Sequence, residues 1–451
     1  MTIANHQGYP TIPEFNGNFD TGLQYYNDSK SIAHSMADIK REINVVVVGG
    51  SYAGAAAAKK LADLSKKGYS GLKVTLIDKS THYFHAVGFP KALIDAKYAE
   101  RAFLPFAGFF EPGFKHAFVQ GKLEKVIDAH SIQLENGQTI HYDYLVIATG
   151  GQAPGPINVI GSTKEAGLAE IAELRAGLDS ANTIMIVGGG AVGVEVAGYA
   201  AAAYPAKKVT LVHSGSRLLP GNFREGVSNG AVEKLGKLGV NVILNERIEL
   251  PSDSAYAAHI GSTEVFGSSG KKYQADVLIK AVGFQVHSEF IEPLEALCGQ
   301  SLRANEEEGP RFIRVLPTLQ IKSAMFPNVF VAGDANDMPM TTKYGFKAEM
   351  QGNTAASNIK RMIECGFDQE LAHALNVDPV AAADVQVPAL SKWSDLVDAI
   401  MVPIGPDLGV AQALKVALGS SALANCLVSL VKSRDFMLWM RKGYFKSRHA
   451  K

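Results

Sequence analysis

A glycine-rich turn near the start of the chain is the first group of residues that could do chemistry. The apolar run over residues 43–48 predicts a buried parallel strand, and the alanine-rich residues that follow through Leu64 predict a helix. Between them, a tight turn at Gly49 would let the backbone N–H groups at the helix start face phosphate groups. The predicted dinucleotide-binding turn consists of Gly49, Gly50, Ser51, Tyr52, Ala53 and Gly54.

The residues after this turn complete a strand–helix–strand pattern. The next predicted strand, residues 73–77, ends at Asp78, whose carboxylate can accept hydrogen bonds from an adenosine ribose. Ser51 occupies a position that is normally glycine, which is a mild departure because serine is small. Taken alone, this match also fits a structural strand-to-helix turn without a ligand.

The same pattern occurs a second time over residues 183–195. Here Gly188, Gly190 and Gly193 fill every glycine position of the motif. Two independent accidental matches in one chain are improbable. The repetition therefore predicts two dinucleotide-binding units.

The second unit carries a clue to its nucleotide. A carboxylate at the end of its second strand would bind the ribose 2′-hydroxyl and repel a 2′-phosphate. That position holds His213, followed by Ser214, Ser216 and Arg217. We expect the site to accept a 2′-phosphorylated nucleotide as well, although polar residues after a strand also fit an ordinary surface loop.

Three further strands end in short polar turns. Residues 144–150 and 277–283 follow the two units and predict strands that return the chain between domains. Residues 328–334 predict a buried strand that ends at Gly333 and Asp334. The carboxylate of Asp334 can bond a ligand hydroxyl.

Composition excludes several other classes of protein. The 451 residues include 44 Lys and Arg and 44 Asp and Glu, so no overall charge attracts nucleic acid, and no nucleic-acid partner is expected. Cys298, Cys365 and Cys426 are too far apart for a local dithiol. No metal site is expected, because histidine and cysteine show no ligand spacing.

In their residues and their order along the chain, these segments resemble the FAD-dependent pyridine nucleotide-disulfide oxidoreductase superfamily. Within that superfamily they resemble the apoptosis-inducing-factor-like branch of ferroptosis-suppressor-like proteins. The resemblance covers most of residues 43–360. The sequence motifs that indicate this branch lie at residues 83–85, 193–197, 209–214, 404–410 and 432–435.

The resemblance implies two Rossmann-like three-layer α/β domains of the glutathione-reductase type, with a small α+β C-terminal domain. FAD would be held by the first glycine-rich turn together with Asp78, Lys79, Val126, Thr149, Gly150, Asp334 and Lys343. NADH or NADPH would be held by Gly188, Gly190, Gly193, His213 and Gly283.

The resemblance also implies catalytic residues. Glu195 would lie near the nicotinamide, Lys91 near the isoalloxazine, and His85 over the flavin. Three ordinary alternatives stay open: an exposed helix glutamate, a solvated lysine and a histidine that caps a turn. Lys343 has the same ambiguity as Lys91.

The electron acceptor must reach the flavin directly, because the chain has no paired dithiol to receive electrons. The resemblance implies an NAD(P)H oxidoreductase that reduces a quinone. Two alternatives stay open: a redox-gated flavoprotein that acts in binding or signalling, and a reductase of a small electron-carrier protein. Rapid turnover with a small quinone would distinguish the quinone oxidoreductase from the redox-gated flavoprotein.

The expected domains are a loose extension (residues 1–40), an FAD domain in two pieces (41–155 and 286–360), an NAD(P) domain (156–285) and a C-terminal domain (361–451). The apolar residues 416–431 are too short for a membrane span and predict a buried helix. The tail at residues 436–446 mixes bulky apolar and basic residues, which fits either a membrane interface or docking on the protein itself. We expect a cytoplasmic protein, either free or peripheral on an intracellular membrane; the oligomeric state does not follow from the sequence.

Overall fold

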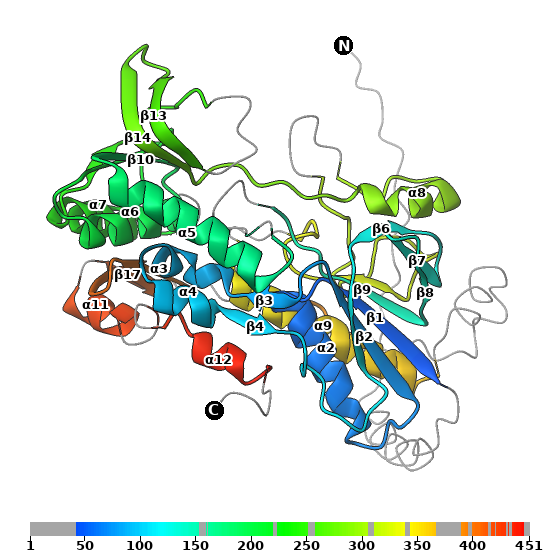
Figure 1. Ribbon diagram of the computed structural model, residues 1–451. Helices are drawn as coiled ribbons and strands as arrows, with labels where there is room; N and C mark the ends of the chain where they lie inside the picture. The colour runs from blue at the N-terminus through cyan, green and yellow to red at the C-terminus, as the bar shows by residue number, and fades with distance from the viewer. Residues whose placement is uncertain are drawn as a thin grey trace, which may run out of the picture.

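The structure is a computed structural model of the 451-residue chain. It describes residues 42–152, 159, 161–219, 223–250, 258–304, 311–338, 343–366, 389–395, 399–413, 416–419, 421–429, 432 and 435–445. The expected extension over residues 1–40 lies outside these residues. Figure 1 shows two α/β lobes, with the C-terminal strands and α11 against the second and α12 beside the first.

The first lobe is built on a five-stranded parallel sheet with the order β15-β9-β1-β2-β5. Its strands are β1 (Ile43–Val48), β2 (Leu72–Asp78), β5 (Ala117–Gln120), β9 (Tyr144–Ile147) and β15 (Val329–Val331). Because both faces are covered, strand β1 is valine on both sides. The sheet combines strands from before and after the second lobe in the sequence.

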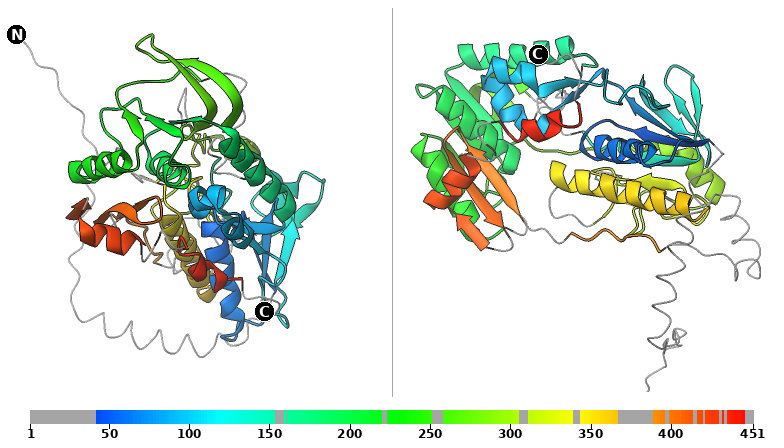
Figure 2. Two further views of the ribbon diagram at one scale, coloured as in Figure 1. Left: turned by 60° about the vertical axis from the view of Figure 1, so that its left-hand side comes forward. Right: turned by 90° about the horizontal axis from the view of Figure 1, so that it is seen from below.

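Helices cover one face of this sheet and a small sheet covers the other. The helices α2 (Tyr52–Ser65) and α9 (Gly345–Glu364) pack side by side (Figure 2, right). Val45 and Val47 of β1 join their core, whereas Val46 and Val48 face the other side. That side is covered by the antiparallel strands β6 (Leu123–Val126), β7 (Ser131–Leu134) and β8 (Thr139–His141).

An insertion between β2 and β5 carries candidate redox residues. It contains the paired strands β3 (His82–Phe84) and β4 (Phe103–Pro105), the turn η3 (Ala86–Gly88), and the helices α3 (Phe89–Ile94) and α4 (Ala96–Ala102). Helix α3 packs against helix α6 (Ala191–Ala203) of the second lobe. The insertion therefore joins the two nucleotide-binding units.

The second lobe repeats the α/β arrangement. Its sheet has the order β12-β11-β10-β14-β13, parallel except for the edge strand β13. The strands are β10 (Thr183–Val187), β11 (Lys208–Val212), β12 (Asn241–Ile243), β13 (Ala258–Phe266) and β14 (Lys272–Lys280). The helices are α5 (Lys164–Ser180), α6 (Ala191–Ala203) and α7 (Glu225–Lys237).

After the second lobe the chain returns to the first through η4 (Glu289–Ile291) and α8 (Glu292–Cys298) and then enters β15. The two Rossmann-like lobes confirm the predicted fold class. The individual domain boundaries at residues 155, 285 and 360 stay predictions.

The C-terminal part contains an antiparallel sheet of β16 (Ile400–Ile404), β17 (Leu408–Ala413) and β18 (Val416–Gly419), with α11 (Ala422–Val428) and α12 (Leu438–Lys442). Its three strands pack on α6 and α7, whereas α12 lies apart from them beside α4 (Figures 1 and 2). The single buried helix predicted over residues 416–431 is wrong. Its first part is β18, and Ser421 then caps α11 by accepting a hydrogen bond from the backbone N–H of Ala424.

Candidate nucleotide and redox site

The first glycine-rich turn has the geometry of a phosphate-binding turn. Gly49 has φ of +98°, and a Cβ there would lie 2.3 Å from the carbonyl oxygen of Ala148. A Cβ on Gly54 would lie only 1.6 Å from the carbonyl oxygen of Gly49. Ser51 starts α2 without a side-chain cap, so N–H groups of the first helical turn face outward. Only glycine fits at Gly49 and Gly54.

Asp78 lies beside this turn at the end of β2. Its Oδ2 accepts the N–H of Gly50 at 2.6 Å, and its Oδ1 accepts the N–H of Ser80 at 2.8 Å. Burial raises the pKa of Asp78, and the N–H groups of Gly50 and Ser80 oppose that rise. The carboxylate is thus fixed where an adenosine ribose would meet the turn.

The remaining residues predicted to bind FAD follow the ends of neighbouring strands. Thr149 and Gly150 come directly after β9, and Gly150 has φ of +67°. Lys79 is exposed after β2. The side chain of Val126 is fully buried in the core, so only its backbone is available to a ligand.

Asp334 offers a direct test of whether these residues fit FAD. Its Oδ1 is buried and has no hydrogen-bond partner within the described part of the chain. Burial raises the pKa of Asp334, and the nearby Lys343 opposes that rise. Lys343 Nζ donates to the backbone oxygen of Asp334 at 3.4 Å and lies 4.4 Å from the ring centre of Phe312. A buried acceptor without a partner costs free energy, and a ligand hydroxyl would remove that cost. The residues therefore fit FAD.

The second glycine-rich turn repeats the first. Gly188 has φ of +123°, and a Cβ on Gly193 would lie 1.8 Å from the carbonyl oxygen of Gly188. Gly190 begins the turn into α6, and no described atom lies within 4 Å of where its Cβ would be. Gly283, with φ of +84°, follows β14 next to this turn. The open space at Gly190 fits the approach of a phosphate.

His213 lies against this second turn. Its Nδ1 accepts the N–H of Gly189 at 3.2 Å, which makes Nε2 the protonated nitrogen of the neutral ring. Nε2 is buried and has no hydrogen-bond partner among the described residues. Burial lowers the pKa of His213. The ring therefore offers a buried donor at the position predicted to contact the ribose.

Glu195 is not an exposed helix residue. It lies on α6, is 4% exposed, and its Oε1 is 2.7 Å from the Nζ of Lys432. Lys432 also donates to the backbone oxygen of Met401 at 2.8 Å. Burial raises the pKa of Glu195, and the charge of Lys432 opposes that rise. A buried carboxylate is thus held by a lysine 237 positions further along the chain.

His85 is 2% exposed and does not cap a turn through its side chain. Nε2 lies 2.7 Å from the backbone oxygen of Phe436, and Nδ1 lies 3.1 Å from Tyr52 Oη and 3.2 Å from Tyr83 Oη. A carbonyl can only accept, so Nε2 carries the proton and Nδ1 accepts from the tyrosines. Burial lowers the pKa of His85 to about 4. His85 is therefore neutral at pH 7.

The backbone that His85 holds is strained. Phe436 and Met437 have φ of 47° and 58°, a region that residues other than glycine rarely adopt. The Tyr98 hydroxyl donates to the backbone oxygen of Asp435 at 3.2 Å. Buried groups of the insertion thus hold two successive carbonyls of this turn.

Lys91 is half-buried on α3 rather than fully solvated. Its Nζ lies 5.3 Å from the ring centre of Tyr98, and burial lowers its pKa. The ring of Phe436 packs near Tyr98 and Tyr199, with Lys432 Nζ 5.7 Å from its centre. The structure therefore gathers the three predicted catalytic residues around one C-terminal turn.

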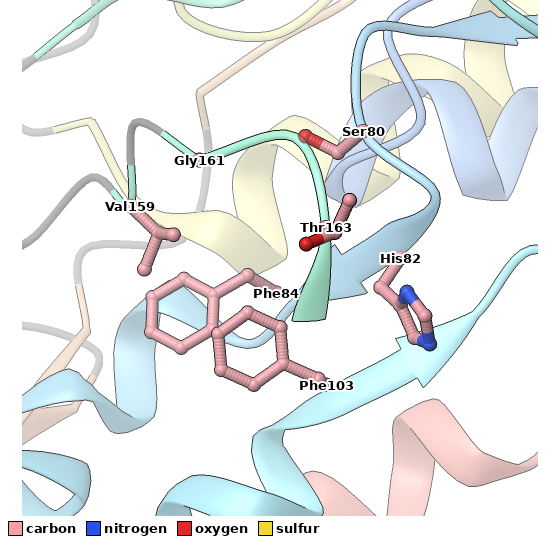
Figure 3. Close-up of a pocket in the computed structure, with 7 residues that line it drawn as sticks. All are labelled: Ser80, His82, Phe84, Phe103, Val159, Gly161 and Thr163. Carbon is pink, nitrogen blue, oxygen red and sulfur yellow. The ribbon is translucent and has the colours of Figure 1, made fainter. Parts of the chain in front are cut away.

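A small cavity lies beside this region but contains none of the predicted site residues (Figure 3). Its volume is about 30 Å³, which is room for one or two water molecules. Burial lowers the pKa of His82 at its wall. It is lined by Ser80, His82, Phe84, Phe103, Val159, Gly161 and Thr163. It is too small for a nucleotide.

Sequence reasoning missed the role of Lys432. The sequence of residues 432–435 indicates only the branch of the family. Nothing in it shows that Lys432 pairs with Glu195 on α6. The contacts of Tyr52 were also missed, because its place in the first turn suggested only backbone binding.

Two dinucleotide turns that flank a common group of buried redox candidates define a flavin- and nicotinamide-dependent oxidoreductase. Residues 43–352 match the family described as pyridine nucleotide-disulphide oxidoreductase. The chain belongs to this family and to its apoptosis-inducing-factor-like branch, and it uses FAD and NAD(P)H.

Individual relatives agree with this assignment. Apoptosis-inducing factor homolog B of Dictyostelium discoideum is 26% identical over 411 residues, covering 87% of this chain and 94% of the relative. Ferroptosis suppressor protein 1 of Homo sapiens is 28% identical over 333 residues, covering 71% and 81%. The sulfide:quinone oxidoreductase structure from Aquifex aeolicus aligns with a TM-score of 0.61 at 19% identity, covering 89% of this chain and 92% of that one, and so shares the fold.

Proposed function

We propose that the chain transfers electrons from NADH or NADPH through FAD to a quinone-type acceptor. The placement of the cysteines carries this proposal: Cys298, Cys365 and Cys426 are free thiols at the end of α8, after α9 and within α11. A flavin without a neighbouring dithiol must reduce its acceptor directly. The resemblance to the branch favours a quinone as this acceptor, and the Aquifex protein that shares this fold is a sulfide:quinone oxidoreductase.

The residues of the chain would bind and orient the nucleotides. The first turn, Asp78 and Asp334 would hold FAD, and the second turn with His213 would hold NAD(P)H. When bound, FAD would supply the capacity to take a hydride from the nicotinamide and to pass electrons on. Neutral His85 would supply hydrogen bonds rather than a charge, and Lys432 would oppose the protonation of Glu195 that burial favours.

The test is an anaerobic titration of the purified holoprotein with NADH and then NADPH, followed by a short-chain quinone. We expect the flavin absorbance to bleach with nucleotide and to return within turnover time when quinone is added. Flavin that is reduced but ignores the quinone would contradict the proposal. That outcome favours a small carrier protein or a redox-gated binding function instead.

We also propose that the acceptor is met at a membrane surface through α12. No helix in the described residues is long and apolar enough to cross a membrane. Trp439 and Met440 are 66% and 42% exposed on α12, as an interfacial contact requires. Phe436, Leu438 and Phe445 of this tail are buried against the protein itself, and Met437 and Tyr444 are partly buried.

Vesicle flotation tests this contact. The double variant Trp439→Ala and Met440→Ala should lose binding to vesicles that contain anionic lipid and keep its turnover with a soluble quinone. The control is Met325→Ala, which removes a residue that is 50% exposed in the turn before β15. Equal flotation of all three proteins would contradict this part of the proposal.

A further inference from the structure

The C-terminal segment, defined here as residues 435–445, lies on the FAD-binding lobe rather than on the sheet that precedes it. Its helix α12 lies beside α4 and near the start of α2 (Figures 1 and 2). The segment touches the FAD lobe at several places, including an ion pair of Asp435 with Arg101 at 2.5 Å. Two of its residues, Arg441 and Phe445, reach the surroundings of the first glycine-rich turn.

Arg441 is anchored from two sides. It is 7% exposed, and its Nη2 lies 2.5 Å from Oε2 of Glu349 on α9. The guanidinium carbon lies 4.9 Å from the ring centre of Tyr52. The Tyr444 hydroxyl also donates to Glu349. A buried guanidinium with both a carboxylate and an aromatic face has a well-defined position.

Tyr52 connects Arg441 to the first glycine-rich turn. It is the first residue of α2, directly after Ser51. Its hydroxyl accepts the N–H of Val87 at 3.2 Å and lies 3.1 Å from Nδ1 of His85. The ring that Arg441 covers therefore belongs to the helix start that faces the FAD pyrophosphate.

Phe445 supports the other side of the same turn. Its ring centre lies 5.1 Å from Tyr83, 5.8 Å from Phe106 and 5.2 Å from Phe109. The Phe106 ring fills the space beside Gly50, because a Cβ there would lie 2.3 Å from Phe106 Cζ. Gly50 is the residue whose N–H binds Asp78. Loss of Phe445 would free Phe106 to move away from the turn.

We propose that Arg441 and Phe445 are positioning residues of the FAD site. Acting through Tyr52 and Phe106, they hold the first glycine-rich turn and α2 in the conformation that retains FAD. The C-terminal segment then sets how fast FAD leaves the protein. This inference depends on FAD binding and is independent of the identity of the electron acceptor.

The test measures FAD release from the full-length holoprotein by the fluorescence of free FAD after dilution. Arg441→Ala and Phe445→Ala should each release FAD about tenfold faster, since each loses a buried contact that supports the turn. Arg441→Lys keeps the charge but not the planar stacking. Its rate of FAD release should lie between the rates of the wild type and of Arg441→Ala. Lys442→Ala, an exposed change in the same helix, should release FAD at the wild-type rate.

A second measurement separates positioning from general stability. A ligand that binds only the folded state raises its melting temperature, so weaker retention lowers the melting temperature of the holoprotein alone. The lost buried contact itself lowers the melting temperature of both forms, so we expect each variant to lose more melting temperature as holoprotein than as apoprotein. Unchanged release rates, or equal losses of melting temperature with and without FAD, would overturn the inference. If Phe445→Ala fails to fold, Phe445→Leu makes the same test with a smaller loss of volume.

If the proposed quinone acceptor is wrong, the results differ from those expected if Arg441 and Phe445 do not position the FAD site. A wild-type protein that ignores quinones still binds FAD and still yields all these release rates. Conversely, variants with unchanged release would leave the quinone reaction of the wild type untouched.

Discussion

The two glycine-rich turns share one backbone design but differ in the polar residue beside them. At the first turn, both oxygens of Asp78 already accept backbone N–H groups. At the second, His213 accepts one N–H through Nδ1, and its buried Nε2 has no partner within the described residues. The polar residue of the first site is thus fixed by two backbone hydrogen bonds, whereas His213 makes one such bond to its turn and lies near the backbone of Arg217. That difference suits a cofactor that stays bound and a substrate that comes and goes.

The two halves also meet the C-terminal part of the chain in different ways. The NAD(P) half uses an ion pair, Glu195 with Lys432, and the FAD half uses a neutral hydrogen bond, His85 with the carbonyl of Phe436. Burial raises the pKa of Glu195 and lowers that of His85. The ionisation of Glu195 therefore opposes folding as pH rises, and the protonation of His85 opposes folding as pH falls.

The largest expected effect comes from adding one methyl group to either glycine-rich turn, which tests the FAD-binding and the NAD(P)H-binding turn separately. Gly54→Ala places a Cβ at 1.6 Å from a backbone oxygen, and Gly193→Ala places one at 1.8 Å. Each should cost more than about 4 kcal/mol locally. We expect Gly54→Ala to abolish FAD binding, and Gly193→Ala to keep FAD but lose reduction by NAD(P)H.

Visible absorbance and anaerobic reduction measure these two losses. Gly236→Ala is the control, because no described atom lies within 4 Å of its added Cβ. Loss of FAD from Gly193→Ala would show that the two turns do not act separately.

The next largest effect is expected at the ion pair. Lys432→Met leaves the buried carboxylate of Glu195 without its partner, which should cost about 3 kcal/mol of stability. Removing the lysine raises the pKa of Glu195 further. The contribution of Glu195 to the stability of the variant is then fully present below the ordinary glutamate pKa and is lost as pH rises. The variant should therefore be further below wild type in stability at pH 8 than at pH 5.

Melting temperatures at these two pH values provide the measurement. Lys237→Met removes an exposed pair with Glu233 and should change stability by less than about 0.5 kcal/mol. A pH-independent deficit at Lys432 would mean that the charge of Glu195 is not what the lysine compensates.

His85 should give the opposite pH dependence. Its folded pKa of about 4 lies below the ordinary 6.5, so its contribution is present above pH 6.5 and is lost as pH falls towards 4. A shift of this size corresponds to about 3 kcal/mol. His85→Gln should flatten the fall of melting temperature between pH 6.5 and 4. An unchanged slope in the variant would assign the acid sensitivity to other groups.

The smallest effect is expected at His213. His213→Asp places a carboxylate at the second turn, where it should repel a 2′-phosphate and lower kcat/KM for NADPH relative to NADH by about tenfold. The exposed change His130→Asp should leave that ratio unchanged. If the ratio is also unchanged in His213→Asp, the histidine lies outside the ribose contact.

The backbone of both sites could be predicted from the sequence because its signals are local. A run of valines followed by Gly49 needs no distant partner to indicate a buried strand and a phosphate turn. Asp78 and His213 each come at or directly after the end of a strand, so their places followed from the pattern.

The side-chain contacts between the halves could not be predicted in this way. Lys432 and Glu195 are 237 positions apart, and Arg441 and Glu349 are 92 apart. No periodicity pairs such residues. The predicted helix over 416–431 failed for a related reason, since apolar composition alone does not distinguish a short strand and helix from one longer helix.

Strand β15 has a consequence for how the protein is made on the ribosome. It pairs with β9, although residues 148–328 stand between the two strands. At about 5–20 residues per second, roughly 10–40 s of synthesis separate β9 from its partner. During that time the first lobe has an uncovered strand edge beside β9 and lacks α9. We therefore expect the nascent first lobe to need protection from aggregation until the second lobe has been completed.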